Sequence, residues 1–273
     1  LQMKLIRKII DLNKAINKIS DLGFVPTMGG LHRGHTSLIK ISQKSCKKTI
    51  VSIFVNPKQF SKKSDFLNYP SNIDKDLNIL KKLKVDYVFI PTAKEILFKK
   101  KKLKFKINKS ERILCAKYRK GHFEGVLDIM DRLVKLISPK KIFMGEKDFQ
   151  QFFIVKKFIE ANYHSKIYLC KTIRDKNNVA LSSRNFFLNK KNLIQAGIIS
   201  NELIKFKLQI KNKMKKIDQF LNDKKNELEA KFNIKIEYLD VRNIINLKNT
   251  NINKNYKLFI AYYISGVRLI DNF

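Results

Sequence analysis

The fold of this 273-residue chain is indicated most clearly by residues 22–35, which read LGFVPTMGGLHRGH. Residues 22–28 are mostly apolar and predict a strand that ends at the glycine pair Gly29 and Gly30. A helical pattern follows from His35 to Lys48. A strand, a glycine-rich turn and a helix in this order are typical of a βαβ unit. The N-terminus of such a helix carries free N–H groups that can bind an anion.

The same alternation continues along the chain. Further strands are predicted at residues 49–55, 85–90, 142–144 and 167–173, with helices at residues 73–83, 126–137 and 148–162. The run at 49–55 is nearly all apolar and β-branched, as in strands that are buried on both faces. We therefore expect an α/β fold built on a Rossmann-like parallel sheet with helices on both faces.

After residue 174 the pattern changes. Residues 190–228 are mostly helical and rich in Lys, and two strands are predicted at 235–241 and 257–264. We therefore predict two domains: a Rossmann-like domain at 1–174 and a smaller α+β C-terminal domain at 175–273. In the first domain, the alternating residues 103–107 follow a run of Lys and predict an edge strand protected by charge.

The composition restricts the class of protein. The net charge is +35, but only nine of the 58 basic residues are Arg, the residue that nucleic-acid-binding proteins favour for bidentate contacts. Lys is spread along the chain together with Ile and Asn, all of which have A/T-rich codons, so we interpret the charge as compositional bias. The hydrophobic fraction of 44% excludes a disordered chain. We expect no nucleic-acid partner.

Two further features of the sequence concern location. No apolar run is long enough to span a membrane, and no signal-peptide core is recognisable, so we expect no membrane partner. The three cysteines are widely spaced, which excludes a disulfide framework and a Cys-based zinc site. We predict a cytoplasmic protein.

Four segments hold most of the chemistry. In the first, His32 and His35 bracket Gly34 in an H-x-G-H pattern, and their imidazoles can donate to phosphate oxygens. In the second, Asn56 and Gln59 follow a predicted strand, at the sheet edge where α/β proteins bind ligands. Neutral amides there suit a substrate rich in hydroxyl or amide groups. Taken alone, each segment can also be an ordinary turn.

The third segment has two parts, RKGHF at 119–123 and GEKDFQQ at 145–151. Lys147 can hold a phosphate and Asp148 can accept hydrogen bonds from sugar hydroxyls, although Asp148 can also be a simple helix cap. The fourth segment, LSSRN at 181–185, offers two hydroxyls and an Arg that can clamp an anion.

Taken together and in this order, the segments resemble the pantothenate synthetase family, the pantoate–β-alanine ligases of the nucleotidyltransferase superfamily. The shared patterns are P-T-M-G-x-L-H-x-G-H, F-V-N-P-x-Q-F, G-H-F-x-G-V, G-E-K-D-F-Q-Q and L-S-S-R-N, between residues 24 and 185, and G-V-R-L-I-D-N at 266–272. The resemblance implies an ATP-dependent reaction in two steps, with Mg²⁺ held mainly through the ATP phosphates and not by a protein metal site. (R)-Pantoate and ATP give pantoyl adenylate and pyrophosphate, and β-alanine then releases pantothenate and AMP. It also implies a homodimer whose C-terminal domain acts as a lid.

The resemblance also implies roles for particular residues. The catalytic residues would be His35, His32, Lys147 and Arg184. The ATP-binding residues would be Met28, Gly29, Gly30, Leu31, His32, Arg33, Gly34, His35, Gly145, Glu146, Lys147, Asp148, Ile173, Leu181, Ser182, Ser183 and Arg184. Pantoate and β-alanine would be bound by Asn56, Gln59 and Gln151.

The sequence departs from the family pattern at a few positions. Gly30 replaces a usual Ala, Arg33 a usual acidic residue, Lys120 a frequent Pro, and Asn178 ends a turn that usually ends in Gly. None of these removes a predicted catalytic group. Two alternatives stay open at this point. One is a related nucleotidyltransferase that acts on another small acid. The side-chain amides of Asn56, Gln59 and Gln151 argue against it, because they match the pantoate-binding pattern. The other is a basic nucleic-acid-binding module. The scarcity of Arg argues against it.

Overall fold

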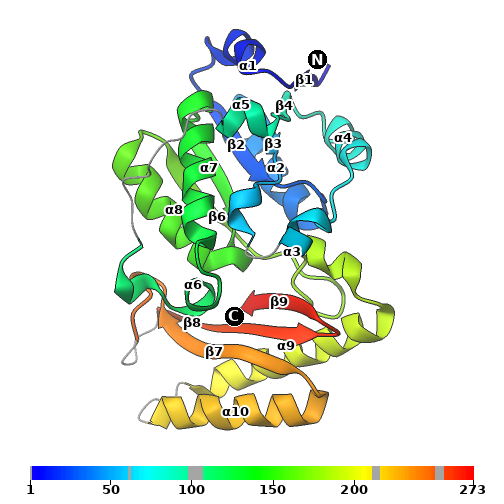
Figure 1. Cartoon of the computed structure of the whole chain (residues 1–273), viewed down its shortest axis with the longest axis vertical. Helices are drawn as coiled ribbons and strands as arrows, with labels where there is room; N and C mark the ends of the chain where they lie inside the picture. The colour runs from blue at the N-terminus through cyan, green and yellow to red at the C-terminus, as the bar shows by residue number, and fades with distance from the viewer. Residues whose placement is uncertain (1, 61–62, 98–106, 211–215, 250–254) are drawn as a thin grey trace. The chain divides into compact units, whose positions relative to one another are not determined.

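The computed structural model describes residues 2–60, 63–97, 107–210, 216–249 and 255–273 (Figure 1). Its contacts divide the chain into two units. The first consists of residues Leu1–Ile107 and Arg119–Thr172, and the second of Asn108–Tyr118 and Ile173–Phe273. The short segment Asn108–Tyr118 therefore belongs with the C-terminal part of the chain.

The first unit is built on a six-stranded parallel sheet in the order β1-β4-β3-β2-β5-β6. The strands are β1 (Lys4–Ile6), β2 (Leu22–Thr27), β3 (Lys48–Ile53), β4 (Tyr87–Phe89), β5 (Lys141–Gly145) and β6 (Lys166–Cys170). The helices are α1 (Ile9–Ile16), α2 (Arg33–Ser45), α3 (Lys63–Leu67), α4 (Ile73–Lys82), α5 (Ala93–Leu97), α7 (His122–Ile137) and α8 (Phe149–Asn162), with short 3₁₀ turns η1 (Pro57–Gln59) and η3 (Glu146–Asp148). The parallel α/β fold predicted from the sequence is thus confirmed.

Both faces of this sheet are buried. Val25, Val51 and Val88 pack on one face against Leu38 and Ile39 of α2. Their strand neighbours, such as Phe24, Ile50 and Phe89, point to the opposite face and are also fully buried. This explains why the strands read as continuous apolar runs rather than alternating ones. Helices α7 and α8 run side by side, as the green ribbons of Figure 1 show.

Several predicted boundaries differ from the observed ones. Helix α2 begins at Arg33 rather than His35, because the imidazole of His32 caps it by accepting the N–H of Gly34. The predicted helix 148–162 begins at Phe149, after the turn η3. Strand β6 ends at Cys170, three residues before the predicted end. Strand β1 was not predicted, since it has only three residues. The predicted edge strand at 103–107 lies, except for Ile107, outside the described residues.

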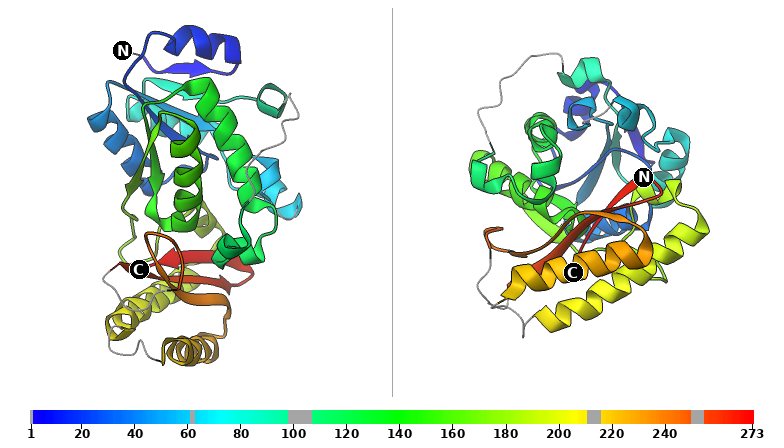
Figure 2. Two further views of the ribbon diagram at one scale, coloured as in Figure 1. Left: turned by 90° about the vertical axis from the view of Figure 1, so that its left-hand side faces the viewer. Right: turned by 60° about the horizontal axis from the view of Figure 1, so that its bottom comes forward.

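The second unit is an antiparallel sheet in the order β7-β8-β9, with strands Lys235–Asn243, Tyr256–Ile264 and Val267–Asn272. Its helices are α6 (Leu114–Tyr118), α9 (Lys190–Ile210) and α10 (Ile217–Phe232), and its 3₁₀ turns are η2 (Lys109–Glu111) and η4 (Ser183–Phe187). Helices α9 and α10 pack on this sheet, which can be followed in both views of Figure 2. Apolar residues of both helices, such as Leu203 and Leu228, form one buried cluster with Ile236, Leu258 and Ile260.

Strand β9 was not predicted from the sequence as a strand, although its residues carry the last family motif. It is formed by a two-residue hairpin from β8, in which Ser265 and Gly266 both have positive φ, of 47° and 78°. Two left-handed residues in a row match the right-handed twist of the flanking strands, and a glycine is well suited to the second position. No helix in the described part of the chain is long and apolar enough to cross a membrane.

Candidate active site

The predicted site residues of the first unit lie at one edge of its sheet. Met28 and the glycine pair follow β2, Asn56 and Gln59 follow β3, and Glu146 to Asp148 follow β5. These three strands are parallel neighbours in the order β3-β2-β5, so their carboxyl ends meet. The amide of Gln59 donates directly to the thioether of Met28. The structure therefore brings together segments from three separate parts of the sequence.

The two histidines of the H-x-G-H pattern are held by backbone donors. The N–H of Gly34 donates to Nδ1 of His32 at 3.1 Å, and the N–H of His32 donates to Nδ1 of His35 at 3.3 Å. Because a backbone N–H can only donate, both Nδ1 atoms are unprotonated and both rings carry their proton on Nε2. The ring centroids are 4.2 Å apart. The loop thus presents two neutral imidazoles, each with an N–H available to a ligand.

Burial keeps these rings neutral. It lowers the pKa of His35 to about 3, with a further contribution from His32. Burial also lowers the pKa of His32 to about 4, helped by the positive charge of Lys147. At neutral pH both rings can donate a hydrogen bond to an anion but carry no charge of their own.

Charge at the site comes from the third segment. The ammonium of Lys147 lies 3.0 Å from the carboxylate of Asp148. Burial by itself would raise the pKa of Asp148, but the positive charges of Lys147 and Arg119 lower it, so this carboxylate is ionised. Lys147 and Asp148 therefore form a fixed pair of opposite charges near the two imidazoles. Gln151 follows in the first turn of α8 and is partly buried.

The turn that carries Asn56 and Gln59 is clamped by helix α7. The amide of Asn56 donates to the carbonyl of Gly125 at 2.9 Å. At the N-terminus of the helix, Nδ1 of His122 lies 2.7 Å from the carbonyl oxygen of Gln59, and Nε2 lies 2.8 Å from the guanidinium of Arg119. The carbonyl can only accept and the guanidinium can only donate, so His122 is neutral and carries its proton on Nδ1.

Arg119 and His122 belong to the RKGHF motif at 119–123, but the sequence predicts no binding or catalytic role for either. Arg119 also donates to the carbonyl of Gln59, at 3.3 Å. Both side chains thus fix the main chain of Gln59, while its side chain faces Met28. Every residue has a backbone carbonyl, so no residue type in the sequence marks this one as the acceptor. Only the folded structure reveals the contact.

The remaining predicted residues, Ile173 and Leu181–Arg184, belong to the second unit. There the N–H of Leu181 donates to the carbonyl of Ile173, and Arg174 and Ala180 form an antiparallel bridge. The hydroxyl of Ser182 caps the turn η4 by accepting the N–H of Arg184. Residues 173–181 are therefore a small hairpin that leads directly into the serine–arginine segment.

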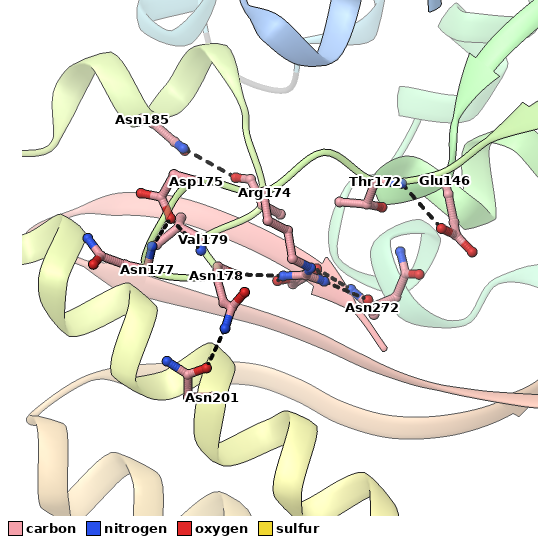
Figure 3. A network of polar contacts seen from close by, with 12 residues as sticks. Glu146, Thr172, Arg174, Asp175, Asn177, Asn178, Val179, Asn185, Asn201 and Asn272 are labelled. Atoms are coloured by element: carbon pink, nitrogen blue, oxygen red, sulfur yellow. Dashed lines mark hydrogen bonds and ion pairs between the residues drawn. The ribbon is translucent and has the colours of Figure 1, made fainter. Parts of the chain in front are cut away.

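This hairpin is fixed by a network of polar contacts, shown in Figure 3. The guanidinium of Arg174 forms two hydrogen bonds to Asp271, of 2.7 and 2.8 Å, and a third to the carbonyl of Asn272. The carboxylate of Asp175 accepts the N–H groups of Asn177 and Val179. Asn178 has a φ of 68°, a left-handed conformation that Asn tolerates better than most residues. This explains how Asn stands where the family usually has Gly.

In the part of the chain that the structure describes, no three His, Cys, Asp or Glu side chains form a group that could hold a metal ion. The predicted polar groups at the sheet edge include two neutral imidazoles, the ammonium of Lys147, the carboxylates of Glu146 and Asp148, and neutral amides. Such a set can neutralise and orient an anionic ligand, and it can bind hydroxyl groups beside it. It contains no paired base and hydroxyl of the kind that covalent catalysis uses.

Comparison with known proteins agrees with this chemistry. The family model for pantoate-beta-alanine ligase matches residues 3–273. The chain is 34% identical over 276 residues to the pantothenate synthetase of Thermosipho africanus, and 37% identical over 281 residues to that of Clostridium botulinum (strain ATCC 19397 / Type A); each alignment covers 99% of both proteins. It is also 41% identical to the bifunctional pantoate ligase/cytidylate kinase of Prochlorococcus marinus, of which it covers 53%.

Solved structures give the same result. The pantoate-beta-alanine ligase of Francisella tularensis, crystallised with beta-gamma ATP and beta-alanine, has a TM-score of 0.84 and 33% identity, covering 99% of this chain and 97% of that one. The pantothenate synthetase of Thermus thermophilus has a TM-score of 0.89 and 26% identity, covering 99% of both chains. With a family model matched along nearly its whole length and relatives above 30% identity, the chain belongs to the pantoate–β-alanine ligase family.

Proposed function

We propose that this protein condenses (R)-pantoate with β-alanine in an ATP-dependent reaction that passes through a pantoyl adenylate. In the first step, the pantoate carboxylate attacks the α-phosphorus of ATP and pyrophosphate leaves. In the second, the amine of β-alanine attacks the acyl carbon, loses a proton, and AMP leaves. The observation that carries the proposal is the pair of neutral imidazoles at the start of α2, beside the amides that follow β3.

The residues of this chain have distinct roles in the proposal. His32 and His35 donate their Nε2–H groups to phosphate oxygens, where charge develops in the first step. Lys147 adds a full positive charge, and Asp148 is placed to accept ribose hydroxyls. Asn56, Gln59 and Gln151 bind the hydroxyl and carboxylate groups of pantoate. These are tasks of alignment and charge neutralisation, which need no enzyme nucleophile.

For the second unit we propose that Ile173 and Leu181–Arg184 contact ATP, with Arg184 and the two serine hydroxyls on the phosphates. Mg²⁺ would accompany ATP, held mainly by phosphate oxygens, since the described residues offer few carboxylate ligands at the sheet edge. We further propose a homodimer in the cytoplasm. All three cysteines are buried and free, which suits a reducing compartment, and sedimentation of the purified protein would measure the assembly.

The proposal is tested by pantoate-dependent exchange of labelled pyrophosphate into ATP, without β-alanine. We expect exchange that requires (R)-pantoate and falls by at least about 100-fold in His35→Ala, which removes one donor to the developing charge. His164→Ala is the matched control, because this histidine is exposed and follows the end of α8. Exchange driven better by another carboxylic acid would instead identify a related nucleotidyltransferase.

A further inference from the structure

The turn before His32 is bent into an unusual backbone conformation. Gly29 and Gly30 both have positive φ, of 81° and 63°. Two left-handed residues in succession direct the chain sharply from the end of β2 into α2. Since glycine is the most flexible residue in an unfolded or loose loop, something other than the glycines must hold this turn in one state.

A buried carboxylate accepts hydrogen bonds from the main chain of this turn. Asp76, on α4, is only 1% exposed. Its two oxygens accept one N–H each, from Gly30 at 2.9 Å and from Leu31 at 2.8 Å. The fit is close, because a Cβ built on Gly29 would lie 2.9 Å from an oxygen of Asp76. The carboxylate therefore packs directly against the turn, and both of its oxygens accept hydrogen bonds from the main chain.

The energetics support a specific role rather than a chance contact. Burying a carboxylate is costly unless hydrogen bonds compensate for the lost water. Burial raises the pKa of Asp76 above its usual value, and the two backbone hydrogen bonds offset this rise only in part. Two residues earlier on the same helix, Asp74 is exposed to solvent, where an acidic residue in a first turn is explained by the helix dipole alone. Asp76 lies in the same first turn, but its burial needs a further explanation.

We propose that Asp76 is a positioning residue for the histidine pair, acting through the peptide groups of Gly30 and Leu31. Leu31 directly precedes His32, whose own N–H donates to His35. Fixing the peptide of Leu31 therefore fixes the cap of α2 and the direction in which both imidazoles present their Nε2–H groups. The catalytic meaning of this role rests on the function proposed above, but the positioning itself does not.

The variant Asp76→Asn separates this role from simple packing. It keeps the shape of the side chain, but an amide offers one acceptor oxygen and an NH₂ group that cannot accept the second N–H. Loss of one charge-assisted hydrogen bond to the loop is expected to raise KM for ATP by about ten-fold, with a much smaller change in KM for pantoate. The matched control is Asp74→Asn, which removes the same charge from the exposed side of the same helix and should leave both constants unchanged.

A second readout needs no substrate. The chain contains four histidines, so selectively ¹⁵N-labelled histidine gives a spectrum with few signals. In the parent protein at pH about 5, His32 and His35 should be neutral with the proton on Nε2, because burial and the neighbouring Lys147 lower both pKa values. In Asp76→Asn, loosening of the turn should hydrate both rings and move their titration upward toward 6.5, and the signal of the exposed His164 serves as the internal reference.

The outcomes are distinct. Upward titration of His32 and His35 in Asp76→Asn, but not in Asp74→Asn, supports the positioning role. Unchanged histidine signals in Asp76→Asn, or a uniform loss of activity without a split between the two KM values, would overturn it. If the parent protein shows no pantoate-dependent exchange while the histidine signals still respond to Asp76→Asn, the proposed function fails and the positioning role stands.

Discussion

At the scale of single residues, the informative feature is a pair of histidines that stay neutral. Their backbone contacts fix the tautomer, and their burial lowers the pKa of His35 to about 3 and that of His32 to about 4. The sequence predicted their place and their phosphate-facing role but left their protonation state open. Protonation depends on burial and on Lys147, which lies more than a hundred positions away in the sequence, so only the folded chain decides it.

The histidine pair also predicts how stability depends on pH. In the unfolded chain both rings take up a proton below about pH 6.5, whereas in the folded protein they do so only near pH 3–4. Their contribution is therefore complete above pH 6.5 and is lost as the pH falls. Urea unfolding between pH 7 and 4.5 should show a slope that His35→Asn reduces by up to about 1.4 kcal/mol per pH unit. An unaltered slope in His35→Asn would contradict a ring that stays neutral in the folded protein.

At the scale of elements, the site depends on how closely α7 approaches the turn η1. A Cβ on Gly125 would lie 2.4 Å from the carbonyl oxygen of Lys58 and 2.9 Å from the nitrogen of Gln59. Both are backbone atoms, so the turn could not yield by rotating a side chain. The family pattern G-H-F-x-G-V had marked this glycine, but its spacing alone did not show what it approaches.

We therefore expect Gly125→Ala to destabilise the protein and to weaken pantoate binding. Overpacking at such a contact costs about 1–3 kcal/mol in the free energy of unfolding, and the displaced turn carries Asn56 and Gln59. The control for stability is Gly145→Ala, whose Cβ would meet nothing within 4 Å. Urea unfolding measures the first effect and KM for pantoate the second. Equal stability of the two variants would show that the turn adjusts without cost.

The elements also show where sequence patterns are sufficient. Strands β2, β3 and β5 were predicted within a few residues, because buried parallel strands are continuous apolar runs. The start of α2 was misplaced by two residues because its cap is a histidine, which is not among the usual capping residues. Strand β9 was missed because its alternation of apolar and polar residues is weak. The two-residue turn before it, whose residues have positive φ, is what starts the strand.

At the scale of the whole molecule, the dominant feature is the net charge of +35. With 58 basic and 23 acidic residues, even full pairing of every acid would leave a large excess of Lys. Partly buried pairs such as Arg174–Asp271 and Arg268–Glu237 use some of the acids inside the second unit. The remaining lysines repel one another, which destabilises the compact state relative to the expanded chain.

Stability should therefore rise with ionic strength. Between about 20 and 300 mM NaCl the Debye length falls from roughly 20 Å to below 10 Å, which screens the repulsion between exposed lysines. We expect the Tm to increase by several degrees over this range and to level off at higher salt. A calorimetric salt series on the full chain measures this. A Tm that is constant or falls with added NaCl would mean that favourable ion pairs outweigh the repulsion.

The whole chain also shows what local patterns cannot encode. Residues 108–118 precede α7 in the sequence, yet their contacts lie with the second unit. Tyr118 donates to the carbonyl of Glu237 at 2.7 Å, and Cys115 lies 3.1 Å from the hydroxyl of Tyr238. The partners are about 120 positions apart, and one of them is a main-chain oxygen.

The sequence by itself determined the α/β class, the strands that are buried on both faces, and the motifs that stand at the strand ends. These follow from apolar periodicity and from glycine and histidine placement, which are local properties. The tertiary structure alone decided that Asp76 supports the Gly29–Leu31 turn, that Arg119 and His122 hold the carbonyl of Gln59, and that both histidines of the pair are neutral. Each of these depends on contacts between distant segments, on hydrogen bonds to backbone groups, or on burial. Such properties exist only once the chain has folded.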